Sequence, residues 1–432
     1  MNNLHPSDFH VETLGKPTIL SPIKMNDYIG EDEKILFDIN PETIEECKKN
    51  GKGVITLERS GPREKIFFDP KNSKAAIVTC GGLCPGINNV IRSVSLELLF
   101  QYEIKSVTGY QYGFKGIADE RIETIDLNSN TLAGISERGG SILSSSRGPQ
   151  DVVKMVDRLE KDNINLLFVI GGDGTLRGGA DLTREIKKRK VNIGIIGIPK
   201  TIDNDLSFIS KSFGFETAYS KAVETIQAVH TESLGAYNCI GIVKVMGRHS
   251  GAIACHASIA SLDVNFCLIP EVPFSLDDPG GFLPALKNRI LTTGHAVIVI
   301  AEGAAREHIP DTGRTDASGN IRLGDSGTWL KELIENYMST ENVMSNVKYI
   351  DPSYLLRAIP ADPNDALYCT LLGQYAVHAA MSGRTNMVIG QWNHYFINLP
   401  IEIVTRERKM VNTNGSIWKA VLESTGQNIT PL

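Results

Sequence analysis

The stretch LLFVIGGDGT, residues 166–175, joins an apolar run of strand length to a loop made of glycines and one acid. The same texture returns in IGIIGIPKTIDND (193–205), IGIVKVMGR (240–248) and VIVIAEG (297–303). Amphipathic segments follow such loops, and a repeated order of strand, loop and helix is the pattern of parallel α/β sheets. The sequence therefore predicts an α/β fold of doubly wound, Rossmann-like parallel sheets.

Length and composition set the broad class of the protein. At roughly 100–200 residues per domain, 432 residues predict two or three domains. Hydrophobic residues make up 41% and charged residues 22%, and the net charge of −6 leaves no basic surplus for nucleic acid or acidic lipid. We expect two α/β domains with a cleft between them, preceded by a polar N-terminal extension.

The cysteines and the apolar runs bear on the compartment. Seven scattered cysteines argue for a reducing environment rather than a disulfide framework. The N-terminus MNNLHPSDFHVETL (1–14) has no apolar signal core, and no apolar run approaches the roughly 20 residues of a spanning helix. We expect a cytoplasmic protein, neither secreted nor transmembrane, with no nucleic-acid or membrane partner.

Polar signatures follow the expected strands, where ligands bind in open α/β sheets. The loop CGGLCPGINN (80–89) has glycines that would let the backbone approach a phosphate at a helix N-terminus. A tight strand-to-helix turn explains the same residues. The loop is neither a Walker A motif nor the G-x-G-x-x-G dinucleotide fingerprint.

Two acidic loops suggest catalytic chemistry. Asp173 in GGDGT would hold Mg²⁺, which takes one or two carboxylates plus phosphate oxygens; an Asp-Gly turn is the alternative. Asp203 would accept the proton of an attacking hydroxyl, which contributes about 10²–10⁴-fold in rate. Asp205 would bind Mg²⁺ or orient Asp203, and an acidic surface loop is the alternative for both residues.

Three further segments carry groups that suit a phosphorylated sugar. Arg248 in MGRHSG would clamp a phosphate or offset charge on a transferring phosphoryl group. Glu302 would bond sugar hydroxyls. Tyr354 and Arg357, at i and i+3, share a helical face and would hold a sugar phosphate, with Lys348 nearby in sequence.

Taken together, these segments resemble the 6-phosphofructokinase family. The order and spacing of GG-x-x-PG-x-N, GGDGT, PKTIDND, MGR-x-SG, AEG and YIDPSY-x-x-R is similar to that family over residues 74–390. The resemblance implies the glycolytic phosphorylation of fructose 6-phosphate at its 1-hydroxyl. It also implies Mg²⁺ with a nucleotide co-substrate, allosteric control, and a homo-oligomer, either a tetramer or a dimer.

The resemblance assigns roles to individual positions. Catalysis would fall to Asp203, Thr201 and Arg248, and Mg²⁺ to Asp173. The residues implied to bind the phosphoryl donor are Gly82, Ser146, Arg147, Gly172, Gly174, Thr175 and Lys200. The residues implied to bind the sugar phosphate are Thr201, Asp203, Asp205, Met246, Gly247, Arg248, Glu302, Lys348, Tyr354 and Arg357.

The domain boundaries expected from this resemblance follow the motifs. Residues 1–74 form the extension, and 75–215 form the nucleotide- and phosphate-binding domain, completed by about 358–398. Residues 216–357 form the sugar-phosphate domain, and 399–432 form a C-terminal tail.

Two positions bear on the phosphoryl donor, and they disagree. Pyrophosphate-using members usually carry Asp at the position of Gly174, where a carboxylate would crowd and repel the α-phosphate of ATP. They also carry Lys at the position of Lys200, where bacterial ATP users have Gly. Because steric exclusion is harder to escape than an added cation, we predict ATP. The combination resembles an ATP-using subgroup close to the pyrophosphate enzymes, including trypanosomatid ones.

Other functions fit the sequence less well. GGDGT also occurs in lipid and NAD kinases, which lack PKTIDND and MGR. A pyrophosphate-dependent enzyme and a non-catalytic sugar-phosphate-binding subunit are the remaining alternatives. One departure concerns assembly: Cys239 falls near the position where bacterial members reach a neighbouring subunit's substrate with an arginine, and Asn238 is the candidate substitute.

Overall fold

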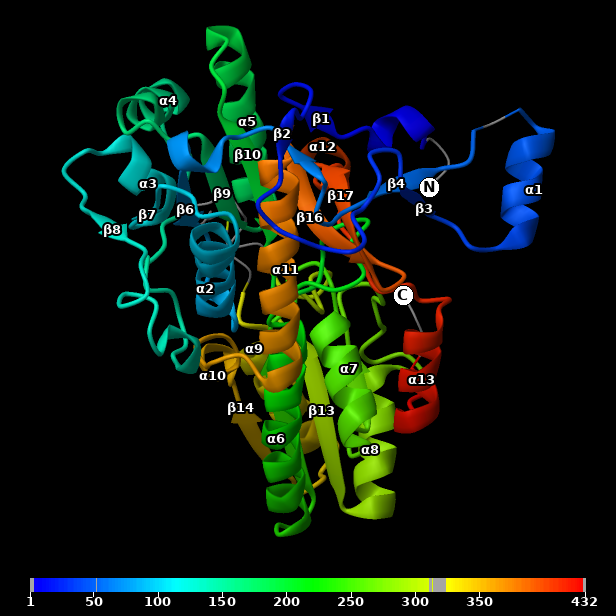
Figure 1. Cartoon of the computed structure of the whole chain (residues 1–432). Helices are drawn as coiled ribbons and strands as arrows, with labels where there is room; N and C mark the ends of the chain where they lie inside the picture. The colour runs from blue at the N-terminus through cyan, green and yellow to red at the C-terminus, as the bar shows by residue number, and fades with distance from the viewer. Residues whose placement is uncertain (1–3, 52, 311–312, 314–323, 430–432) are drawn as a thin grey trace. The chain divides into compact units, whose positions relative to one another are not determined.

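The computed structural model describes residues 4–51, 53–310, 313 and 324–429 (Figure 1). By their contacts these residues form two compact units. Unit 1 comprises Met1–Thr201, Leu206–Gly214 and Ile359–Glu407. Unit 2 comprises Ile202–Asp205, Phe215–Ala358 and Arg408–Leu432.

Unit 1 contains both the N-terminal region and the first group of α/β repeats. Its strands are β1 (Glu12–Thr13), β2 (Ile19–Leu20), β3 (Lys34–Leu36), β4 (Thr56–Arg59), β5 (Lys65–Ile66), β6 (Lys74–Thr79), β7 (Ser106–Tyr110), β8 (Thr124–Asp126), β9 (Leu166–Gly171), β10 (Gly194–Pro199), β15 (Arg384–Thr385), β16 (Met387–Trp392) and β17 (Tyr395–Pro400). Its helices are α1 (Pro41–Lys49), α2 (Ile87–Leu96), α3 (Gly113–Ala118), α4 (Val152–Lys161), α5 (Asp173–Arg189), α11 (Pro363–Met381) and α12 (Ile401–Val404). Short helical turns are η1 (Pro6–Phe9), η2 (Pro70–Asn72), η3 (Glu97–Gln101) and η4 (Ile135–Glu137).

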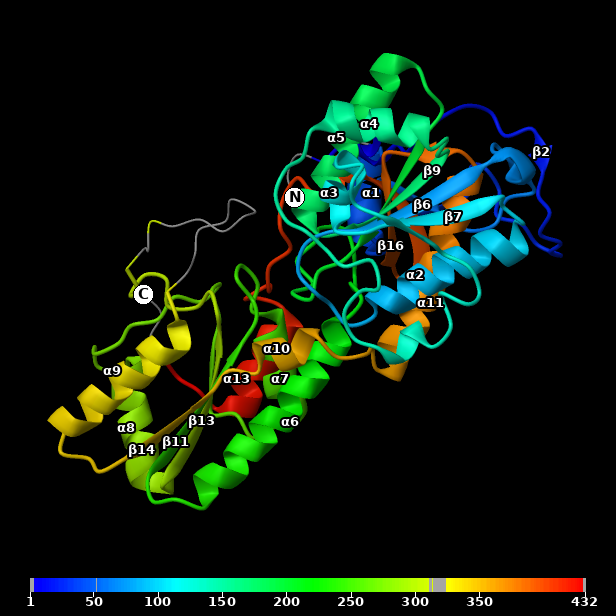
Figure 2. The ribbon, with the colours of Figure 1, turned by 90° about the vertical axis from the view of Figure 1, so that its left-hand side faces the viewer.

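The main sheet of unit 1 has the strand order β3-β4-β17-β16-β10-β9-β6-β7-β8. Its centre, from β16 to β7, is parallel, and antiparallel strands flank it on both sides. Every residue of β9 and β10 is buried, as expected for parallel strands that are covered on both faces. Figure 2 shows α4 and α5 on one side of this sheet and α2 and α11 on the other.

The N-terminal region has several short strands, and they are built into unit 1. β4 pairs with β17 and β3 pairs with β4, so both strands extend the main sheet. β1 pairs with β15, and β2 pairs with β5. Phe9 and Leu57 from this region are buried in one core cluster with Leu206, Ile209 and residues of β16, β17, α5 and α12.

Unit 2 is a smaller parallel α/β unit. Its strands are β11 (Cys239–Val245), β12 (Phe266–Leu268), β13 (His295–Ala301) and β14 (Asn346–Ile350). Its helices are α6 (Phe215–Leu234), α7 (Ala252–Ser261), α8 (Phe282–Thr293), α9 (Ser326–Thr340), α10 (Ser353–Arg357) and α13 (Ser416–Thr425). The sheet has the order β12-β13-β11-β14, and all its pairs are parallel.

Helices cover both faces of this second sheet. In Figure 2, α6 lies on one side of β11, β13 and β14, and α8 and α9 lie on the other. The predicted α/β class with Rossmann-like parallel sheets is therefore confirmed for both units. Within the described part of the chain, no helix is both long and apolar enough to cross a membrane.

Candidate active site

Backbone hydrogen bonds continue past the ends of three neighbouring strands in unit 1. After β6, the Cys80 N–H donates to the Ile170 carbonyl at 2.9 Å. After β10, the Lys200 N–H donates to the Gly171 carbonyl, also at 2.9 Å. Because β6, β9 and β10 are parallel neighbours, the loops that follow them leave the sheet side by side.

The glycine loop after β6 is joined to a segment far along the chain. The Gly81 N–H donates to the Ser146 carbonyl at 3.0 Å, and the Ser145 hydroxyl donates to the Gly81 carbonyl at 2.7 Å. These bonds place the predicted donor-binding residues Ser146 and Arg147 beside the loop that contains Gly82.

Lys200 is tied to the same loop through its side chain. The residue is buried, and its ammonium donates to the Gly82 carbonyl at 2.7 Å. A buried cation is costly unless it is hydrogen-bonded, so this bond accounts for its place next to the glycine loop. The positive charge raises the local potential for any polyphosphate.

The GGDGT loop depends on a close approach at its first glycine. A Cβ on Gly171 would lie 2.3 Å from the Thr175 Cβ, so only glycine lets the buried Thr175 pack against the strand end. Asp173 is the first residue of α5, where the helix dipole favours a negative charge. The Arg177 guanidinium donates to the Asp173 carboxylate at 2.9 Å. That carboxylate keeps 23% of its side chain exposed, which leaves it accessible to a cation.

In unit 2 the loops after β11 and β13 interlock. Val245 and Ala301 are paired at the strand ends, and the Gly303 N–H donates to the Gly247 carbonyl at 3.1 Å. A Cβ on Gly303 would come within 2.0 Å of the Arg248 carbonyl oxygen, so this approach requires glycine. Arg248 Nε consequently lies 3.9 Å from a carboxylate oxygen of Glu302.

Asp203 faces this pair of loops within unit 2. Its Oδ1 is excluded from solvent, and the Arg248 backbone N–H donates a hydrogen bond to its carboxyl. Burial raises the pKa of Asp203 well above its ordinary value, and the charges of Asp205 and Glu302 raise it further. The Arg248 N–H and guanidinium oppose this rise. A carboxylate with a raised pKa is a stronger base, which suits proton abstraction.

Asp205 has a partner that the sequence did not indicate. Arg408 Nη1 donates to Asp205 Oδ2 at 3.3 Å, and the Lys409 N–H donates to the Asp205 carbonyl at 2.9 Å. Both residues come from the C-terminal 34 residues, which were expected to form only a tail. Burial lowers the pKa of Lys409 to about 8. Nothing in the local pattern around Arg408 marks it as a site residue.

Three further residues predicted to bind the sugar phosphate lie on or after β14. Arg357 stacks over the Tyr354 ring at 4.9 Å, so the two share a helical face as their spacing predicts. Tyr354 is 75% exposed, which leaves its outer side open to a ligand. Lys348 lies opposite Gly241, in the middle of the strand pair, and its ammonium is 3.5 Å from Glu232.

Residues 74–380 match the family model described as phosphofructokinase. The chain belongs to the phosphofructokinase family. It is 45% identical to the ATP-dependent 6-phosphofructokinase of Borreliella burgdorferi, over 98% of this chain and 97% of that protein. It is 41% identical to the enzyme of the same name from Amycolatopsis methanolica, with 98% and 96% covered. The Trypanosoma cruzi enzyme of that name is 39% identical, with 98% and 89% covered.

Solved structures of phosphofructokinases share the fold. A pyrophosphate-dependent phosphofructokinase from Marinobacter aquaeolei matches with a TM-score of 0.67 at 20% identity, over 83% of this chain and 93% of that one. Pichia pastoris phosphofructokinase matches with a TM-score of 0.64 at 21% identity, over 83% of this chain and 37% of that one. The predicted family and its trypanosomatid-like subgroup are confirmed by the relatives, while the role of each site residue stays a prediction.

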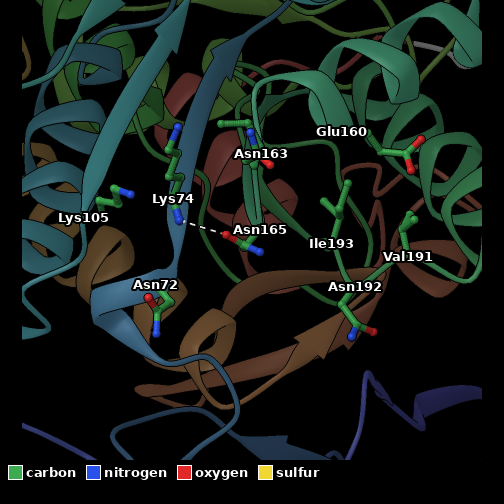
Figure 3. Close-up of a pocket in the computed structure, with 10 residues that line it drawn as sticks. Asn72, Lys74, Lys105, Glu160, Asn163, Asn165, Val191, Asn192 and Ile193 are labelled. Atoms are coloured by element: carbon green, nitrogen blue, oxygen red, sulfur yellow. Dashed lines mark hydrogen bonds between the residues drawn. The ribbon is translucent and has the colours of Figure 1, made fainter.

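A cavity of about 610 Å³ in unit 1 lies away from these loops (Figure 3). Its lining includes Lys74, Lys105 and Asn165, which lie at or before the amino ends of β6, β7 and β9. The Lys74 N–H donates to the Asn165 side-chain oxygen at 2.9 Å, which ties two of these strands together (Figure 3). The predicted phosphate loops follow the opposite ends of the strands, so this cavity is separate from them.

Because the pKa of Asp203 is raised in the folded protein, its ionised form destabilises the fold. Asp203→Asn removes this charge and should therefore stabilise the protein at high pH. A group whose pKa is higher in the folded state stabilises the fold fully below its unfolded pKa and loses that contribution as pH rises. We expect Asp203→Asn to unfold a few degrees above the parent at pH 8, since about 1 kcal/mol moves the Tm by roughly 2–4 °C in a domain of 150–250 residues. The difference should shrink toward pH 4. Thermal unfolding across pH tests this, and a variant less stable than the parent at pH 8 would contradict it.

Proposed function

We propose that this chain is an ATP-dependent 6-phosphofructokinase, which transfers the γ-phosphoryl group of ATP to the 1-hydroxyl of fructose 6-phosphate. The observation that carries the proposal is Asp203, the acid of the family's PKTIDND motif, held beside Arg248 and Glu302 with a raised pKa. The names of the relatives that cover nearly the whole chain support the same reaction.

In this proposal Asp203 accepts the proton of the 1-hydroxyl as that oxygen attacks the phosphoryl group. Arg248 offsets negative charge that develops during transfer, and Glu302 accepts hydrogen bonds from sugar hydroxyls. Tyr354 and Arg357 hold the sugar phosphate. Most of the rate enhancement comes from positioning and charge stabilisation, as in phosphoryl transfer generally.

The unit 1 loops hold the donor phosphates in this proposal, with Mg²⁺ at Asp173. Mg²⁺ binds one or two carboxylates and fills its remaining positions with water and phosphate oxygens. The described residues contain no group of three or more His, Cys, Asp or Glu side chains placed to hold a metal. Asp173 with its single accessible carboxylate fits a Mg²⁺ that arrives with the nucleotide. When bound, the ion neutralises charge on the transferring phosphate.

Gly174 supports ATP over pyrophosphate because the fold itself does not require glycine there. A Cβ built on Gly174 meets no heavy atom within 4 Å. Gly174 is the second residue of α5, and glycine is a weaker helix former than alanine. The fold has room for a side chain at position 174, yet the residue there is glycine, which weakens the helix. This supports the interpretation that the space is kept for a ligand. In this proposal the α-phosphate of ATP occupies that space.

We also propose a cytoplasmic homo-oligomer, a dimer or a tetramer, on the strength of family membership. The cross-subunit arginine of bacterial members has no equivalent here. Cys239 is buried in β11, and the Asn238 side-chain amide donates to the Met344 carbonyl at 2.9 Å. Asn238 stays the candidate substitute for the missing arginine, with one of its side-chain N–H groups already bonded within its own chain.

The donor is tested with the purified protein, fructose 6-phosphate and Mg²⁺, given either ATP or pyrophosphate. We expect fructose 1,6-bisphosphate with ATP and at least about tenfold less with pyrophosphate, which corresponds to about 1.4 kcal/mol of discrimination. Activity with pyrophosphate alone would reverse the choice of donor. Binding of the sugar phosphate without turnover by either donor would favour the regulatory-subunit alternative.

The base is tested by turnover of Asp203→Asn, which keeps the shape of the side chain and removes its basicity. We expect kcat to fall by about 10²–10⁴-fold while the protein stays folded. Steady-state kinetics at saturating substrates provide the measurement. Near-parental kcat in this variant would show that another group accepts the proton.

Donor selectivity is tested with Gly174→Asp and its control Gly174→Ala. The alanine methyl group enters open space, so we expect Gly174→Ala to retain ATP turnover. The aspartate adds a negative charge, so we expect ATP-dependent kcat/KM to fall at least about tenfold through repulsion at short range. Equal ATP activity in the two variants would refute the steric and electrostatic argument.

A further inference from the structure

The chain takes an unusual backbone path just after the acids of the PKTIDND motif. Asn204 and Phe208 have φ angles of 51° and 60°, in the left-handed region. Asparagine tolerates that region, whereas a bulky residue such as Phe adopts it rarely and only where surrounding structure holds it. Phe208 lies three residues after Asp205, so the path of the motif is set by whatever holds Phe208.

An aromatic cluster holds Phe208 within unit 1. The cluster consists of Phe9, Phe37, Phe208 and Trp392. The Phe208 ring meets Phe9 edge to face, with centroids 5.3 Å apart, and lies 5.7 Å from Phe37. Phe37 stacks on Trp392 at 4.9 Å, and the Trp392 indole N–H donates to the Phe37 carbonyl at 2.8 Å. Aromatic pairs in these geometries attract beyond simple burial, so the cluster offsets the strain at Phe208.

Hydrogen bonds fix the backbone on both sides of the cluster. The Ser210 N–H donates to the Gln391 carbonyl at 3.0 Å, next to Trp392. The Ser207 hydroxyl donates to the Glu407 carbonyl at 2.8 Å. Leu206 and Ile209 are buried in the same core cluster as Phe9. Five consecutive residues before Lys211 are therefore held by side-chain packing or by bonds to segments remote in sequence.

Most of the cluster lies outside the part of the chain that matches the family model. That match covers residues 74–380, whereas Phe9 and Phe37 precede it and Trp392 follows it. Only Phe208 belongs to the matched part. The N-terminal region thus reaches the segment next to the catalytic motif through two rings.

We propose that this aromatic cluster positions the catalytic loop, with Phe208 as a positioning residue for Asp203 and with Phe9 and Phe37 as its supports. The proposal rests on the proposed function, because it assumes that Asp203 accepts a proton. The N-terminal region then acts in catalysis indirectly, by keeping the left-handed turn at Phe208. Small displacements of a reacting group lower the rate strongly, so loosening this turn should reduce turnover more than substrate binding.

The test is a double-mutant cycle on kcat with Phe37→Leu, Phe208→Leu and both together. Each single variant should lower kcat by about 10–100-fold, since a displacement of about 1 Å costs about that much. KM for ATP should change less than kcat, because the predicted donor residues other than Lys200 lie outside the loop that follows β10. The double variant should be no slower than the worse single variant, because both changes break one contact.

Two further variants separate positioning from general loss of stability. Phe68→Leu removes a buried ring of unit 1 that packs edge to face on Phe67 at 5.0 Å, in a different aromatic pair. It should lower the Tm as much as Phe37→Leu does and leave kcat within about twofold of the parent. Phe208→Tyr keeps the ring and should restore kcat to within about threefold.

Several outcomes would overturn the proposal. Near-parental kcat in Phe208→Leu, additive losses in the double variant, or an equal loss of kcat in Phe68→Leu would each show that the cluster is ordinary core. Full activity in Phe208→Gly, which accepts the left-handed turn without a ring, would show that the rings are dispensable. A parent protein inactive toward fructose 6-phosphate would instead refute the proposed function itself.

Discussion

The site depends on backbone hydrogen bonds that extend parallel strand pairing one residue beyond the strands. The bonds from Cys80 to Ile170 and from Lys200 to Gly171 keep three loops aligned as they leave the sheet of unit 1. In unit 2 the bonds from Glu302 to Val245 and from Gly303 to Gly247 extend the pairing of β13 and β11 by up to two residues. Parallel strands present all their carboxyl ends at one edge, so groups far apart in sequence meet without any dedicated scaffold. Glycine is required at position 303, where a Cβ would come within 2.0 Å of the Arg248 carbonyl oxygen of the neighbouring loop.

This arrangement makes the proposed base expensive to hold. A carboxyl group that has one oxygen excluded from water and lies next to two other acids resists ionisation, and its pKa is raised as a result. One backbone N–H and one guanidinium of Arg248 offset part of it. Evolution commonly retains such destabilising groups where chemistry needs them. The cost at Asp203 is therefore better evidence for a catalytic role than the presence of two acids in a loop.

The sequence predicted the repeated strands and their loops. An apolar run of about six residues that ends at a glycine or an acid is too short for a buried helix and fits a buried strand followed by a loop. It also predicted that Tyr354 and Arg357 meet, since their spacing defines a helical face. It could not predict the contact between Arg408 and Asp205, which are 203 residues apart and share no local pattern. The strained turn at Phe208 was equally hidden, because nothing in a Phe residue signals a left-handed backbone. Such contacts depend on how remote segments pack.

Gly174 and Lys200 indicate different phosphoryl donors. In the structure, Gly174 is the stronger evidence of the two. The Lys200 ammonium is bonded to the Gly82 carbonyl, so part of its role is to hold the glycine loop whichever polyphosphate binds. A residue with a structural role says little about the donor. Gly174 has no such role, because a side chain there would meet open space. Since the fold does not explain the glycine, ligand binding is the simpler explanation, and the nucleotide is the larger ligand of the two.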